Sequence, residues 1–144
     1  MRKLIAALLV LALTCPAFAE RVGELPARAT AVSATSGDVA AATATATIAA
    51  PSVAGASNYL CGFDMRGTGA TSATTVALTI TGLVGGTMTF QVLVVAGATT
   101  ATPSLTVQFP VCLKGTPDTA VVVSMPTFGT GALHAMINAW GYVY

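Results

Sequence analysis

Apolar and polar residues alternate along most of this chain with the period of two that is typical of β-strands. The clearest example lies in residues 75–81, where Val76, Leu78 and Ile80 alternate with threonine and alanine. Similar alternation marks several further segments, and the pattern therefore predicts about seven short strands. The other predicted strands are residues 42–48, 59–66, 88–94, 105–109, 121–123 and 133–144.

Turn-forming residues separate these segments. Glycine, proline and small polar residues are concentrated between the predicted strands, in residues 51–58, 67–72, 82–86, 97–103, 114–118 and 126–131. No segment carries the apolar stripe of an amphipathic helix, and the threonine and valine content favours strands. We therefore predict an all-β fold, an antiparallel two-sheet β-sandwich of the Ig-like or jelly-roll-like kind. The same strands closed into a barrel are the alternative.

The first 19 residues have the three parts of a secretory signal peptide. Arg2 and Lys3 are basic, residues 4–13 are apolar, and residues 17–19 read Ala-Phe-Ala, a small-x-small cleavage pattern. The apolar run is shorter than the roughly 20 residues of a membrane-spanning helix. We expect cleavage after Ala19 and a secreted, periplasmic or cell-surface protein. A structural N-terminal helix is the alternative.

The chain after this cleavage site is long enough for one domain but not for two. Residues 20–38 contain Pro26 and several charges without a sustained apolar period, so we predict a flexible N-terminal arm. Residues 39–144 are predicted to form the β-sandwich domain. Lipidation at Cys15 is a further alternative, although the Leu-Thr that precedes this cysteine does not match a lipobox.

Charged residues are few, with 6 Lys and Arg and 5 Asp and Glu in 144 residues. They form no basic cluster, which argues against nucleic acid as a partner. Residues 67–113 contain no charge at all, so the surface of that half must be neutral. Soluble sandwiches usually protect their edge strands with charged residues. We therefore expect these edges to be covered by a protein partner or a second copy, unless glycine and proline kinks protect them.

Cys61 and Cys112 are the only cysteines that follow the predicted cleavage site. An even pair in an oxidising compartment usually forms a disulfide. We predict that these two residues are bonded, with two buried free thiols as the alternative.

The sequence offers no recognisable catalytic or metal-binding pattern. His134 is the only histidine, and no serine lies in a G-x-S-x-G turn. Asp38, Asp64 and Asp118 fall in predicted turns or strand ends, and the metal-ligand spacings of zinc and calcium sites are missing. The glycine-rich residues 82–86 fit a hairpin turn better than a phosphate loop. We expect a protein that is not an enzyme and that uses no metal or cofactor.

Trp140, Tyr142 and Tyr144 alternate at the end of the last predicted strand, so they share one face. They are the candidate contact for a ligand or a subunit. These aromatic residues could cover the end of the sandwich or a subunit interface. They could also form a stacking platform for sugar, or the closing strand of a small outer-membrane β-barrel.

Residues 59–144 resemble the small Ala/Thr/Gly-rich β-sandwich domains of tailed-phage virion proteins and of uncharacterised exported bacterial proteins. This resemblance implies a non-enzymatic fibre, decoration or surface role. The signal peptide and the cysteine pair depart from the virion domains and favour a host-encoded exported protein. The similar stretches are residues 61–63, 67–76, 78–87, 97–99 and 139–142.

These observations lead to a ranked set of hypotheses. The first is an exported structural or surface domain that self-associates or decorates a larger assembly. The second is a carbohydrate-binding β-sandwich that uses Trp140 and the neighbouring tyrosines. A pilin-like subunit and a small outer-membrane barrel are weaker alternatives.

Overall fold

The computed structural model of the protein describes residues 25–97, 99–129 and 132–144. The predicted signal peptide and residues 20–24 of the predicted arm lie outside these ranges. The described residues contain no helix, and so none that could cross a membrane. They form eight strands: β1 (Thr30–Thr35), β2 (Ala44–Ile48), β3 (Asn58–Thr68), β4 (Thr74–Thr81), β5 (Met88–Val94), β6 (Ala101–Lys114), β7 (Val121–Met125) and β8 (His134–Val143).

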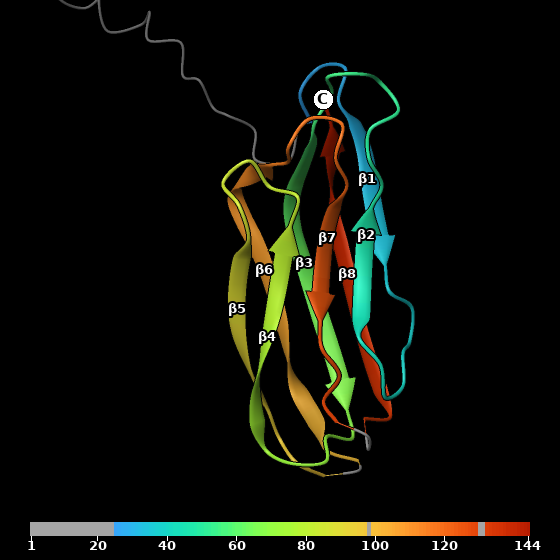
Figure 1. The fold of residues 1–144 in the computed structure, drawn as a ribbon, viewed down its shortest axis with the longest axis vertical. Helices are drawn as coiled ribbons and strands as arrows, with labels where there is room; N and C mark the ends of the chain where they lie inside the picture. Colours follow the sequence, from blue (N-terminus) through green and yellow to red (C-terminus); the bar gives the residue numbers. More distant parts are fainter. Residues whose placement is uncertain (1–24, 98, 130–131) are drawn as a thin grey trace, which may run out of the picture.

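The strands form two four-stranded antiparallel sheets that pack face to face (Figure 1). Sheet A has the order β1-β8-β3-β6, and sheet B has the order β2-β7-β4-β5. The chain thus pairs its first strand with its last, its second with its seventh, its third with its sixth and its fourth with its fifth. This is the strand order of a jelly roll. The predicted two-sheet β-sandwich is confirmed, with eight strands in place of about seven.

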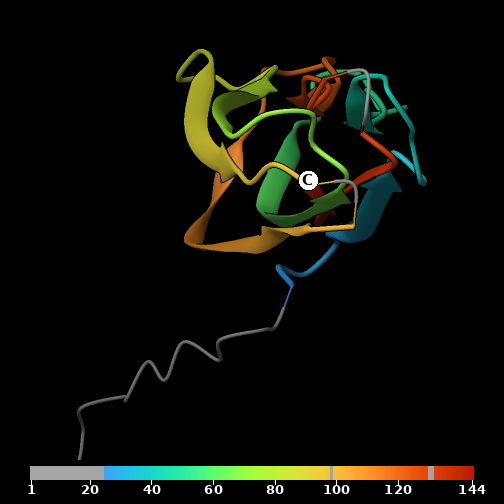
Figure 2. The same cartoon turned by 90° about the horizontal axis from the view of Figure 1, so that it is seen from below.

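Figure 2 shows the two sheets end-on, and the buried hydrophobic residues of both sheets form the core between them. Each strand sends every second side chain inward; in β4, for example, Val76, Leu78 and Ile80 are buried. Phe63 and Leu60 of sheet A are fully buried against this layer. The two open sides of the sandwich are formed by β1 with β2 and by β5 with β6.

Strand β1 corrects the predicted N-terminal arm. Residues 30–35 are not flexible chain, because they pair with β8 from Thr30 opposite Val143 to Thr35 opposite Asn138. Val32 and Ala34 pack against the core. The alternation in this strand uses alanine, serine, threonine and a single valine, so its period is weak in the sequence. The sandwich therefore begins at β1 and not at residue 39.

Strand β6 is longer than the predicted residues 105–109. The sequence has a proline on each side of that segment, and a central strand would not tolerate either of them. β6 lies at the edge of sheet A, where proline does not interrupt a hydrogen-bonded ladder on both sides. Its pairing with β3 shifts between Leu60 and Gly62 and again between Met65 and Gly67. Pro103 and Pro110 lie in these irregular stretches. Proline and bulges are among the features that keep an edge strand from pairing with another chain.

The predicted disulfide is confirmed. Cys61 on β3 is bonded to Cys112 on β6, with a Cα–Cα distance of 4.2 Å and a sequence separation of 51 residues. The bond crosses the first irregular stretch of the β3–β6 pair, where the backbone ladder is interrupted. A disulfide is compatible with an oxidising extracellular environment.

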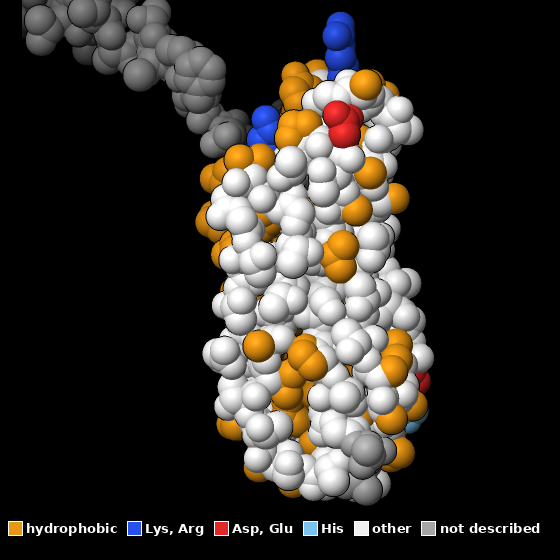
Figure 3. All heavy atoms as spheres, viewed as in Figure 1, with side chains coloured by type: hydrophobic (Ala, Val, Ile, Leu, Met, Phe, Trp, Pro, Cys, Tyr) orange, Lys and Arg blue, Asp and Glu red, His pale blue; other side chains and the backbone are white. Residues whose placement is uncertain are grey.

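The outer faces of the two sheets differ in charge. Within the described residues, no Lys, Arg, Asp or Glu lies on a strand of sheet B. A row of hydroxyl side chains crosses all four strands of sheet B instead, and Figure 3 shows this face as largely neutral. The row consists of Thr45, Ser124, Thr79 and Thr89 in register. The charged side chains that lie on strands belong to sheet A.

Candidate functional site

The outer face of sheet A is organised around its two central strands, β3 and β8. They are antiparallel neighbours from Asn58 opposite Val143 to Thr68 opposite His134. Along each of these strands, every second residue points into the core, so the alternate residues face outward. We call the resulting series of outward pairs the β3–β8 ladder. It consists of Tyr59–Tyr142, Gly62–Trp140, Asp64–Asn138, Arg66–Met136 and Thr68–His134.

The ladder begins with two stacked tyrosines. The rings of Tyr59 and Tyr142 lie 4.8 Å apart, centroid to centroid, with an interplanar angle of 8°. Burial raises the pKa of Tyr142, and the neighbouring Tyr59 raises it further. The ammonium group of Lys114 lies 6.0 Å from the Tyr59 ring centroid, at the limit of a cation–π contact. The tyrosine pair therefore forms an ordered aromatic surface at one end of sheet A.

Trp140 lies across the neighbouring strand, over Gly62. A Cβ atom at position 62 would come within 2.5 Å of Cζ2 and 2.8 Å of Cε2 of the indole, and within 2.6 Å of the Val107 carbonyl oxygen. The indole therefore occupies the space that any side chain at position 62 would need. Trp140 is nevertheless only partly buried, so part of its surface is open to solvent.

The structure brings together two of the three predicted aromatic residues and adds a third. Trp140 and Tyr142 lie on consecutive pairs of the ladder. Tyr59 joins them from β3, and only the register of two strands distant in sequence could reveal this. Tyr144 follows β8, its side chain is 59% exposed, and its backbone bonds to Ser57. It makes no ring contact among the described residues.

The middle of the ladder is polar. The side-chain amide of Asn138 donates a hydrogen bond from Nδ2 to Oδ1 of Asp64, at 2.7 Å. Both residues are half-buried. This bond orients the Asp64 carboxylate and leaves its second oxygen free of any hydrogen bond within the described residues.

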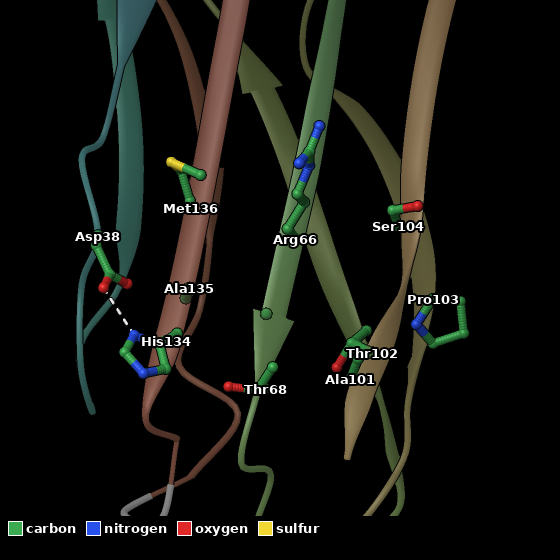
Figure 4. Close-up of a pocket in the computed structure, with 11 residues that line it drawn as sticks. Asp38, Arg66, Thr68, Ala101, Thr102, Pro103, Ser104, His134, Ala135 and Met136 are labelled. Atoms are coloured by element: carbon green, nitrogen blue, oxygen red, sulfur yellow. Dashed lines mark hydrogen bonds and ion pairs between the residues drawn. The ribbon is translucent and has the colours of Figure 1, made fainter. Parts of the chain in front are cut away.

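A groove of about 650 Å³ continues the same face beyond this pair. Its volume falls within the roughly 300–1,000 Å³ typical of small-molecule sites. Figure 4 shows Asp38 and His134 on one side of the groove, Ser104 and Pro103 on the other, and Arg66 between them. The groove therefore spans sheet A from the segment after β1 to the edge strand β6.

His134 and Asp38 are joined by a hydrogen bond at one wall of this groove. The distance from Nδ1 of His134 to Oδ2 of Asp38 is 2.7 Å, and the two side chains are 61% and 57% exposed. Such exposed pairs contribute little to stability. The backbone of this segment is held more firmly, since Val39 and Ala135 exchange two hydrogen bonds.

Arg66 is the free cation of the groove. Its side chain is exposed and forms no ion pair with a carboxylate in the described part of the chain. The guanidinium points along β3 away from Thr68, toward the beginning of the strand and the aromatic end of the face (Figure 4). Arg66 therefore extends from the groove toward the Asp64–Asn138 pair and the aromatic residues that follow it along the ladder.

The three aspartates of the described chain each have a different hydrogen-bond partner. Asp38 bonds to His134 and Asp64 bonds to Asn138. Asp118 accepts a hydrogen bond from the backbone N–H of Gly55 at 2.7 Å, in the loops outside both sheets. His134 has no serine or cysteine bonded to it among the described residues. No group of three or more metal-ligating side chains occurs among the described residues either.

Comparison of the chain with protein-family models, curated proteins and solved structures found no match.

Proposed function

We propose that this protein binds carbohydrate on the outer face of sheet A. The observation that supports this proposal is the continuity of the face. Trp140 and the stacked pair of Tyr59 and Tyr142 lie next to a polar groove, along the same two strands. Sugar rings have apolar faces that stack on aromatic side chains, and hydroxyl groups that require polar partners. Along the ladder, the aromatic side chains come first and the polar side chains follow them.

The polar groups of this face are arranged for binding. Ligand sites typically combine apolar or aromatic walls with a few placed polar groups. Here Asp64, Asn138, Arg66 and Ser104 provide the donors and acceptors. Among the described residues, no nucleophile on this face is bonded to a base, and we therefore propose binding without catalysis. The jelly roll itself does not specify an activity.

The expected location fits the same proposal. The predicted signal peptide and the confirmed disulfide both favour an exported protein. An exported domain meets the polysaccharides of cell walls, capsules and matrices, and its neutral surface suits that exposed environment. We therefore propose a secreted, periplasmic or cell-surface binding module.

The test is binding of the purified protein to a glycan array, followed by titration calorimetry with the glycans that bind. We expect Trp140→Ala to weaken binding at least about 10-fold, because truncating a tryptophan that anchors an interface commonly costs about 2 kcal/mol or more. Val84→Ala is the matched control, since Val84 is 61% exposed in the loop after β4. An array with no bound glycan, or equal binding by both variants, would overturn the proposal.

A second candidate function is self-association as a structural or surface component, and the observation that favours it is the edge strand β5. Among the described strands, β5 pairs only with β4, and it carries no charge or proline. Leu93 is 62% exposed on this strand, and Met88 is 36% exposed. An uncharged edge strand with exposed apolar residues is a template for pairing with another chain. This candidate predicts an oligomer in solution.

A further inference from the structure

We propose that Asp64, Asn138 and Arg66 select the ligand of sheet A, and that they select uncharged sugars over acidic ones. This inference rests on the proposed carbohydrate binding and specifies its ligand class. It assigns the polar middle of the β3–β8 ladder a role in recognition, next to the aromatic platform formed by Trp140, Tyr142 and Tyr59.

The position of these residues supports a shared site. Asp64–Asn138 is the ladder pair next to Gly62–Trp140, and Arg66–Met136 is the pair after it. Outward residues two apart on a strand are separated by about 7 Å. A sugar ring stacked on Trp140 would therefore place its hydroxyl groups beside Asp64 and Asn138. The next units of an oligosaccharide would reach Arg66, whose guanidinium points toward the aromatic end.

The hydrogen-bonding capacity of the three side chains matches hydroxyl groups. Ionised carboxylates accept about four hydrogen bonds, and among the described residues Asp64 accepts one side-chain bond, from Asn138. The guanidinium of Arg66 carries five N–H donors and bonds no side chain of the described chain. A sugar hydroxyl both donates and accepts. It can donate to Asp64 and accept from Arg66, and bonds that involve a charged partner are the stronger kind.

The charge on this face favours an uncharged ligand. Asp38, Asp64, Arg66 and Lys114 are its charged residues, two of each sign, and His134 bonds to Asp38. An acidic sugar stacked on Trp140 would bring its anion beside the Asp64 carboxylate, because Asp64 belongs to the ladder pair next to Gly62–Trp140 and Arg66 to the pair after it. Like charges at such distances disfavour binding. The ladder therefore discriminates against carboxylate and sulfate groups at the unit next to the platform.

The experiment compares neutral oligosaccharides with uronate-containing and sulfated oligosaccharides by titration calorimetry. The unmodified protein should bind its neutral ligand at least about 10-fold more tightly than either acidic class. Asp64→Asn removes the charge at nearly constant shape, and it should weaken neutral binding about 10- to 100-fold. It should also reduce the discrimination against acidic ligands. Asp118→Asn removes a charge outside sheet A and is the matched control; thermal unfolding of each variant verifies that it is folded.

The outcomes separate the two proposals. Acidic ligands that bind as tightly as neutral ones, or an Asp64→Asn variant with unchanged selectivity, would overturn the selection of uncharged sugars. Binding that still depends on Trp140 would in that case leave the carbohydrate proposal intact. If no glycan of any class binds, both proposals fail.

Discussion

At the scale of single residues, the missing side chain at Gly62 determines where the Trp140 indole lies. The ring fills the space above this glycine, and the Val107 carbonyl oxygen closes the same space from the side of β6. A glycine inside a strand usually weakens it, and here it marks a close approach of another group. The aromatic platform therefore depends on a residue that makes no side-chain contact itself.

This arrangement predicts that Gly62→Ala destabilises the protein by about 1–3 kcal/mol, as overpacking does elsewhere. The new Cβ would displace the indole and press on the Val107 carbonyl. Urea-unfolding midpoints measure the loss. The cost should be smaller in a Trp140→Ala background, because the ring is then absent. A Gly62→Ala variant as stable as the unmodified protein would show that the indole does not occupy this space.

At the scale of elements, β1 and β6 show why edge strands are difficult to predict from a sequence. β1 lacks large apolar residues, and its place in sheet A depends on pairing with β8 at the opposite end of the chain. β6 contains two prolines that suggest turns, yet an edge strand accommodates them. The disulfide joins β6 to β3 where their ladder is irregular. In the chain-entropy description, closing a loop of this length contributes roughly 4 kcal/mol.

The inclusion of β1 in the sandwich can be tested with a pair of neighbouring substitutions. Val32→Asp places a charge on the inward side, where Val32 packs against the core, and we expect a loss of about 1–3 kcal/mol. Ala31→Asp places the same charge on the exposed side and should change stability little. Denaturant unfolding compares them. Equal stability of both variants would indicate that residues 30–35 are a flexible arm after all.

At the scale of the whole molecule, charge and hydroxyl groups are divided between two faces. Sheet A carries ionisable side chains and aromatic residues, whereas sheet B presents neutral hydroxyl groups and the apolar edge strand β5. Carbohydrate binding on sheet A and self-association through β5 would therefore use different surfaces. One molecule could do both, and paired copies would gain avidity for a repetitive polysaccharide.

Self-association through β5 predicts that the purified protein is an oligomer at high concentration and that Leu93→Lys makes it monomeric. A lysine on an edge strand opposes pairing with a second chain. Val53→Lys adds the same charge in a loop, where Val53 is 66% exposed, and should leave the oligomer intact. Light scattering measures both. A monomer at every concentration would exclude this second candidate function.

The sequence by itself determined the strands with strong alternation, the all-β class and the cysteine pair, because period and composition are local properties of the chain. It also placed Trp140 and Tyr142 on one face. The tertiary structure decided that Tyr59 stacks on Tyr142, that β1 belongs to sheet A, and that the jelly-roll order holds. It also assembled the groove from segments that lie far apart along the chain. These features depend on the register between distant strands, and register follows from the packing of the whole core.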